Sequence, residues 1–247
     1  GCAPSPVVNR PTLVETIPAA QQRALAFLRR QFNPSLELMA ESPNIGQHNY
    51  YLANDNALAA YTLAVYGERD LSDRLRASLK RYGYERNDFI EVAWGVPIRW
   101  PPNHHQDVSV KQVGDDRILH ESHAGPGYFY DWSAYSNLVF MGVLNDYNQG
   151  LRASALRQYH IEMSTFDGAG WKDKAYWDRQ GVYETLGLAW AVYAGSKLGV
   201  PDPNLVAALL QKQGTDGGFH THYQVATEPL ADPNIETTSV SLLALDA

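Results

Sequence analysis

Helical stretches with one apolar face alternate along this chain with helical stretches that are apolar on every side. Leu25, Leu28 and Phe32 recur at a spacing of three to four residues, which predicts an amphipathic helix with one buried face. Residues 57–66 have no polar face and are followed by Gly67, a common residue just beyond a helix end. A helix without a polar face must be buried, so an outer helix and then an inner helix are expected.

The same alternation returns three times. Amphipathic stretches precede buried ones, and the pairs are residues 71–82 with 132–145, 156–163 with 182–194, and 205–210 with 235–245. Four outer-then-inner pairs predict an all-α fold, namely an α/α toroid of about four helical hairpins that is either open or closed by other elements.

Residues 83–130 interrupt this scheme. Residues 89–94, 108–110 and 118–120 are strand-like, and Gly114 with the two aspartates after it fits a hairpin turn. A segment this long between helices is usually functional, which indicates an insertion that forms a lid. The alternative is a structural plug that closes a short ring.

The N-terminal segment differs in composition from the rest. Residues 1–18 contain four prolines and are expected to form an extended tether, which leaves residues 19–247 as one domain. Cys2 is the only cysteine, which excludes an intrachain disulfide and a multi-cysteine zinc site. Gly1 and Cys2, followed by prolines and Ser5, resemble the mature start of a bacterial lipoprotein. That resemblance implies a lipid on Cys2 and an extracytoplasmic location; the alternative is an incidental surface thiol.

The charge balance excludes some partners. The chain has 20 basic and 27 acidic residues, a net charge of −7, and its basic residues are scattered. Nucleic-acid binding needs a clustered positive surface, so it is not expected. No apolar run reaches the roughly 18 residues that a membrane span needs, which leaves a lipid on Cys2 as the expected membrane contact.

Two segments near the C-terminus carry a family resemblance. They are residues 210–219, which contain Gln213 and the run Asp-Gly-Gly-Phe, and residues 234–245. They resemble the repeat of the terpenoid cyclase and protein prenyltransferase superfamily, in which this motif lies between an outer and an inner helix. Residues 167–194 are similar to a degenerate second copy. The resemblance implies the toroid fold, but the protonating Asp-x-Asp-Asp motif is absent and the domain has no cysteine for a zinc site. Six-hairpin-type toroids act instead on polysaccharides, as glycosidases with paired carboxylates or as lyases with Tyr, His and Asn.

Each expected inner helix begins with an acid-bearing polar segment, and the acids are Asp55, Asp131, Glu184 and Glu236. If the inner helices run parallel, these acids meet at one mouth of a central cavity. Mutual repulsion would raise their pKa values and leave a protonated acid beside an ionised one, as glycoside cleavage requires. The alternatives are capping or dipole interactions of first-turn acids and a site for a hard cation such as calcium.

Aromatic residues extend this hypothesis. Six tryptophans and 15 tyrosines are many for 247 residues, and tyrosine hydroxyls can bind a polar ligand. The expected catalytic residues are Asp131, Glu184, Glu236 and Tyr183. The expected ligand-binding residues are Asn54, Asp55, Trp132, Tyr135, Trp171 and Asp216. The pairs of histidines along the chain are expected at the surface or in the lid, and no metal or cofactor is predicted.

The sequence therefore predicts a protein that binds a glycan or another small molecule in an acidic, aromatic cavity. As an enzyme it would be a glycoside hydrolase or a polysaccharide lyase. The alternative is a non-catalytic lipoprotein module that binds a ligand or a partner.

Overall fold

The computed structural model describes residues 16–44, 50–103, 107–123, 127–225 and 230–247. The helices are α1 (Ile17–Gln31), α2 (Ala53–Val65), α3 (Arg69–Tyr82), η2 (Asp88–Trp94), η3 (Trp132–Ala134), α4 (Ser136–Asn148), α5 (Arg152–Met163), α6 (Trp177–Gln180), α7 (Thr185–Leu198), α8 (Pro203–Leu210) and α9 (Ile235–Asp246). The strands are β1 (Phe32–Asn33), β2 (Leu38–Met39), β3 (Tyr50–Leu52), β4 (Asp107–Val113), β5 (Asp116–Ser122), β6 (Tyr183–Glu184), β7 (His220–Tyr223) and β8 (Leu230–Pro233).

The expectation of an all-α toroid is wrong, because the fold is mixed α/β. About 53% of the chain is helical, but about 14% lies in eight strands that form three small sheets. Four of these strands are only two or three residues long. Alternation of apolar and polar residues needs four to eight positions to be recognised, so strands this short leave no pattern in the sequence.

The sheets are built from local and distant pairings. β1 and β2 form one antiparallel pair, and β6, β7 and β8 form an antiparallel sheet. β4 and β5 form the expected hairpin, and β3 adds to it in parallel along β5. Residues 89–94, expected as a strand, form the 3₁₀ helix η2 instead.

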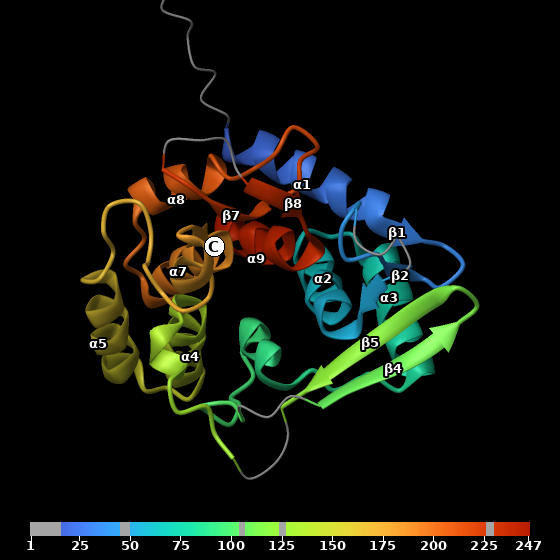
Figure 1. Cartoon of the computed structure of the whole chain (residues 1–247), viewed down its shortest axis with the longest axis horizontal. Coiled ribbons are helices and arrows are strands. Elements are labelled where there is room, and N and C mark those ends of the chain that lie inside the picture. The colour runs from blue at the N-terminus through green and yellow to red at the C-terminus, as the bar shows by residue number, and fades with distance from the viewer. Residues whose placement is uncertain (1–15, 45–49, 104–106, 124–126, 226–229) are drawn as a thin grey trace, which may run out of the picture.

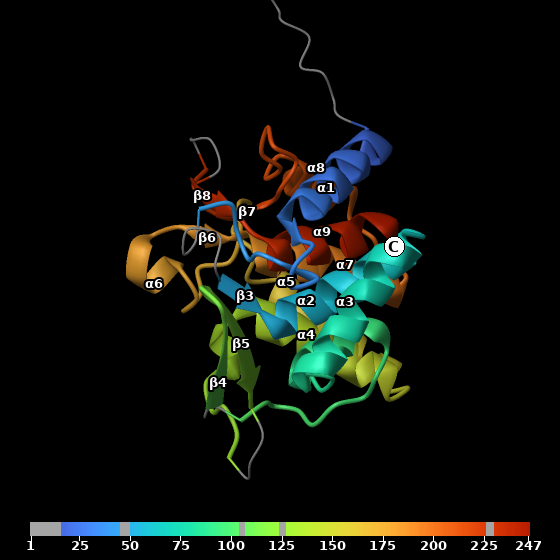
Figure 2. The ribbon, with the colours of Figure 1, turned by 90° about the vertical axis from the view of Figure 1, so that its right-hand side faces the viewer.

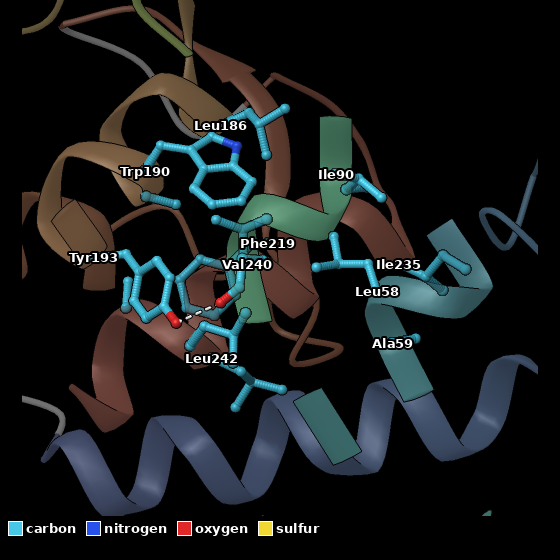
Figure 3. Close-up of a cluster of buried hydrophobic side chains, with 14 of the residues drawn as sticks. Leu58, Ala59, Ile90, Leu186, Trp190, Tyr193, Phe219, Ile235, Val240 and Leu242 are labelled. Carbon is cyan, nitrogen blue, oxygen red and sulfur yellow. Dashed lines mark hydrogen bonds between the residues drawn. The ribbon is translucent and has the colours of Figure 1, made fainter. Parts of the chain in front are cut away.

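Four largely buried helices make up the core. They lie side by side in the order α2, α9, α7 and α4, which is visible in Figure 1. Their side chains are apolar around most of the circumference, and Figure 3 shows Leu58, Ile90, Trp190 and Leu242 gathered in one cluster. We call these four the inner helices.

Outer helices cover this row, but not in the expected pairing. Each of α2, α4 and α7 packs on the helix that follows it, and α9 is covered by α1 from the other end of the chain. The links after α2, α4 and α7 are three or four residues long, and each holds a glycine with positive φ, Gly67, Gly150 and Gly199. Links this short make consecutive helices antiparallel neighbours, which is why the hairpins run from inner to outer.

The 3₁₀ helix η2 lies between the two ends of the inner row. It contacts both α2 and α4, and it is the unlabelled green helix in the centre of Figure 1. The Tyr193 hydroxyl donates to the Ala93 carbonyl at 2.7 Å, and Asn148 Nδ2 donates to the Val92 carbonyl at 3.0 Å. Part of the expected insertion is therefore packed into the helical core.

Short strands lead into three inner helices. β3 runs directly into α2, β6 into α7, and β8 is separated from α9 by one residue. Figure 2 shows β3 to β8 on one side of the molecule and the C-terminal end of α9 on the other. The first turns of these helices consequently lie at the same end, next to the sheets.

The expected tether, including Cys2, lies almost wholly in residues 1–15, outside the described residues, and so do His104 and His105. Among the helices that the structure describes, none has both the length and the apolar character to cross a membrane.

Asn56 gives a test of how the first sheet is attached to α2. This fully buried residue accepts from Met39 N at 2.7 Å and donates to the carbonyls of Met39 (3.0 Å) and Leu52 (2.9 Å). Asn56→Ala leaves buried backbone groups unpaired and should lower the free energy of unfolding by about 3 kcal/mol in urea denaturation. The exposed Asn204→Ala is the matched control and should change it by less than about 0.5 kcal/mol. Equal effects of the two changes would contradict this assignment.

Candidate functional site

The first turn of α2 places one acid between two asparagines. Asn54, Asp55 and Asn56 are all buried, and both asparagines bind backbone. Asn54 donates to the Glu121 carbonyl at 2.9 Å and accepts from Glu121 N at 2.8 Å, which ties α2 to β5. Asp55 instead makes a side-chain hydrogen bond with Glu41, so two buried carboxyl groups share this contact.

Glu41 lies just beyond β2 and is fixed through its backbone. Its N–H donates to the Tyr50 carbonyl at 3.1 Å, and its carbonyl accepts from Ile235 N at 3.0 Å. The pKa of Glu41 is raised from an ordinary 4.5 to about 8; burial is the main cause, the hydrogen bond to Asp55 opposes it, and the charges of Glu236 and Glu121 add to it. Burial and the adjacent Glu41 also raise the pKa of Asp55. The pair therefore holds a proton at neutral pH.

Two more acids extend the cluster to the surface. Glu236 stands in the first turn of α9 and Glu184 directly precedes α7, and both are half-buried. The pKa of Glu236 is raised by burial and then by Asp55, while that of Glu184 is raised by burial, Asp173 and Glu236. Glu41, Asp55, Glu184 and Glu236 thus form one electrostatically connected group, which we call the acidic mouth.

Capping accounts for only part of this group: Glu184 is the N-cap residue of α7 and makes a backbone hydrogen bond with Gly187, while other residues cap α9 and α4. Asn234 caps α9 by accepting from Thr237 N, and Asp173 accepts from Ser136 N at the start of α4. Oε2 of Glu41 and Oε2 of Glu184 are buried without a hydrogen-bond partner in the described part of the chain. Nor does a described lysine or arginine form an ion pair with any of the four. Burying these acids therefore costs free energy that their contribution to helix stability does not offset.

Aromatic groups border the acidic mouth. Burial and then Glu41 raise the pKa of Tyr50, and burial, Glu184 and Glu236 raise the pKa of Tyr176. The His222 ring lies against Tyr176 with centroids 4.8 Å apart, and burial lowers the pKa of His222. His222 is also the cross-strand partner of Glu184. The border therefore offers ring faces, phenol hydroxyls and one neutral imidazole.

Asp131, expected with the other acids, does not join them. Its carboxylate forms an ion pair with Lys174 at 2.8 Å, its side chain is 46% exposed, and this contact lowers its pKa. The reason is that α4 begins at Ser136, after η3, and not at Trp132. Asp131 therefore precedes the 3₁₀ helix η3, and the carboxylate at the start of α4 is that of the loop residue Asp173, which accepts from Ser136 N.

The motif residues Trp171 and Asp216, expected to bind a ligand, make core and turn contacts in the structure. Asp216 Oδ1 accepts from Gly218 N, and Asp167 Oδ1 accepts from Ala169 N and Gly170 N. The aromatic residue after each loop, Phe219 or Trp171, is buried in the core. Both copies of the motif therefore act in the same way, with an aspartate that closes a turn and a ring that anchors it.

Other expected site residues also have structural partners. Tyr183 is buried and donates to Asp167 Oδ2 at 2.7 Å, which raises its pKa to about 12 together with burial. Trp132 packs edge-on against Trp100, and Tyr135 packs against Phe129. Asn54 holds β5, as described above. Of the expected site residues, the structure brings together Asp55, Glu184 and Glu236.

Sequence reasoning missed Glu41, Glu121, Tyr50, Tyr176 and Asp173. All lie outside helices, in strands or loops, whereas the search followed helix starts. Glu121 faces the mouth only because β3 pairs with β5. Asp173 and Tyr176 follow the Gly-rich loop at 167–170, which was the one signal available in the sequence.

Within the described residues, no group of three or more Asp, Glu, His or Cys is arranged to hold a metal ion. Comparison with protein families, with curated proteins and with solved structures found no match to this chain. The resemblance of residues 210–219 to the cyclase and prenyltransferase repeat accordingly stays a prediction.

The pKa of Glu41 predicts how stability varies with pH. Because the folded pKa (about 8) exceeds the ordinary 4.5, the folded state holds this proton more tightly than the unfolded state between these values. The contribution of Glu41 to the free energy of unfolding therefore has its full value below about pH 4.5 and is lost as the pH rises through 8. Glu41→Gln should therefore make the free energy of unfolding fall less between pH 5 and pH 8, measured by urea denaturation. Parallel curves for the variant and the parent would contradict the shift.

Proposed function

We propose that this protein binds a carbohydrate at the acidic mouth and hydrolyses a glycosidic bond there. The observation that carries the proposal is the convergence of Glu41, Asp55, Glu184 and Glu236 without a described counter-cation. Such a group has a surplus of hydrogen-bond acceptors and retains protons at neutral pH.

A polyhydroxylated ligand matches this chemistry. Sugar hydroxyls donate to ionised carboxylates, and a protonated carboxyl donates back to a sugar oxygen. The ring faces of Tyr176 and Tyr50 offer apolar surface beside the acids, which suits the C–H face of a sugar. An anion would instead be repelled by the four acids, and a hard cation needs three or more donors around one point.

Hydrolysis requires an acid that protonates the leaving oxygen and a carboxylate that acts as a base or a nucleophile. Glu184 and Glu236 are half-buried and reach the surface, so they are the groups that a ligand would contact. Glu41 and Asp55 are more deeply buried and share a proton, and burial and then the charge of Asp55 raise the pKa of Glu236. In this proposal Glu184 and Glu236 exchange protons with the substrate, and Glu41 and Asp55 are positioning residues.

Hydrolysis is favoured over elimination by a lyase mechanism. A lyase base removes a proton from carbon, a role for which a phenolate is suited. The pKa values of both border tyrosines are raised, so their phenolate forms are suppressed. The carboxyl groups, whose pKa values are moved towards neutrality, are better matched to proton transfer.

The test uses Glu184→Gln and Glu236→Gln with Asp131→Asn as the matched control, because Asp131 is an exposed acid near the start of α4. Binding of neutral oligosaccharides is measured by titration calorimetry, and cleavage by chromatography of the products. Each Gln variant should weaken binding of a recognised oligosaccharide by about tenfold or more, since a hydrogen bond to a charged group contributes about 1.5–3 kcal/mol. Asp131→Asn should leave affinity and rate unchanged.

The outcomes separate the parts of the proposal. Binding without cleavage at any pH between 4 and 8 would reject hydrolysis and leave a carbohydrate-binding module. Calcium binding that depends on Glu184 and Glu236, with no oligosaccharide binding, would replace the carbohydrate by a cation. Equal binding by all variants would reject the acidic mouth as the site.

A further inference from the structure

A hollow lies between α2, α3 and the segment that leads into η2, and none of the four acids of the acidic mouth is among its described lining residues. Its volume is about 540 Å³, within the range of roughly 300–1,000 Å³ that small-molecule sites occupy. Ala57 and Tyr61 of α2, one turn apart, and Trp94 of η2 form its apolar wall. A smaller hollow of about 210 Å³ shares Tyr61 and Trp94 and continues towards α4 and α7. We call the two together the Tyr61–Trp94 hollow.

The aromatic wall is held in place from several elements. The Tyr61 and Trp94 rings have centroids 5.4 Å apart and an interplanar angle of 38°. Tyr61 also shares a side-chain hydrogen bond with Tyr193, whose hydroxyl donates to the Ala93 carbonyl beside Trp94. Two half-buried rings fixed at a tilt form a preformed surface for a flat ligand.

The rim of this hollow is cationic. Arg76 and Lys80 stand one turn apart on α3, and both are exposed. Neither forms an ion pair with an acid in the described part of the chain. Lys80 lies in the last turn of α3, where the helix dipole favours a cation, but Arg76 lies in the middle of the helix and has no such role. Like charges at this spacing destabilise a helix by about 0.2–0.5 kcal/mol. Glu85 is the one acid among the described lining residues.

We propose that the Tyr61–Trp94 hollow binds a small anionic molecule with a flat ring. The ring lies against Tyr61 and Trp94, and the phosphate or carboxylate of the ligand faces Arg76 and Lys80. This site is independent of the acidic mouth. Tyr61 is six residues beyond Asp55 along α2, about 9 Å in helical rise, and the charge of its rim has the opposite sign.

Two matched pairs of probes test the proposal by titration calorimetry at low salt. Adenosine 5′-monophosphate is compared with adenosine, and benzoate with benzamide, so that each pair differs in the anionic group while keeping its ring. At least one anion should bind at millimolar concentration or better, and at least fivefold more tightly than its neutral partner. The pair that shows this difference identifies phosphate or carboxylate as the preferred group.

The double variant Arg76→Gln/Lys80→Gln should remove the preference for the anion, and Arg157→Gln, an exposed arginine on α5, should leave it intact. Tyr61→Phe, which keeps the ring, should retain binding, and Trp94→Leu should weaken both members of a pair. Circular dichroism confirms that each variant is folded. No saturable binding of either anion by the parent protein, or binding unaffected by the double variant, would overturn the proposal. Glu184→Gln should not change these affinities, so this result is separable from the carbohydrate test.

Discussion

The insertion of the last helix between α2 and α7 is the contact on which the rest of the molecule depends. α9 is buried along almost its whole length, and α1 covers it. Tyr66, the residue after α2, donates a hydroxyl hydrogen bond to the Leu242 carbonyl of α9 at 2.6 Å. The same docking brings Ile235 N to the Glu41 carbonyl at 3.0 Å and so places Glu236 beside Asp55. The acidic mouth therefore exists only when the two ends of the chain have joined.

The acidic mouth is a local conflict within an otherwise consistent fold. Burial disfavours ionised carboxylates, and each neighbouring acid adds repulsion, so the four acids retain protons, and no described residue forms an ion pair with them. Positive ends of the helix dipoles offset part of this cost, because Asp55 and Glu236 lie in first turns. Acids elsewhere in the chain show the contrast: Asp167, held by two backbone N–H groups, Tyr183 and Lys172, has a pKa lowered to about 2. Environment, not residue type, divides these carboxyl groups into two kinds.

The sequence predicts those elements whose hydrophobic pattern extends over many residues, but it does not predict contacts between residues far apart in the chain. Residues 57–66 and 182–194, apolar all round, were correctly expected as buried helices, and the acids at the starts of α2, α7 and α9 follow from reading those helices as parallel. Glu121 could not be found in this way, since its position depends on the pairing of β5 with the three-residue strand β3 about 70 residues away. Glu41 could not be found either, because its backbone is held by Tyr50 and by the distant Ile235. Asp131 was misplaced because the start of α4 differs by four residues from the expected one.

The helix η2, which lies between the two ends of the inner row, is shorter than the helices that it contacts. A 3₁₀ helix of seven residues is roughly 14 Å long, whereas an α-helix of 13 residues, such as α2 or α4, is about 20 Å long. An element this short between α2 and α4 cannot fill the full depth that they span. The unfilled part lies where η2 ends, at Trp94 and Gly95, and both residues line the smaller part of the Tyr61–Trp94 hollow. A short helix between longer ones thus accounts for the smaller part of the hollow, whereas the larger part lies between α2, α3 and the residues before η2. The tilted aromatic pair and the two cations at the rim distinguish the hollow from a packing defect.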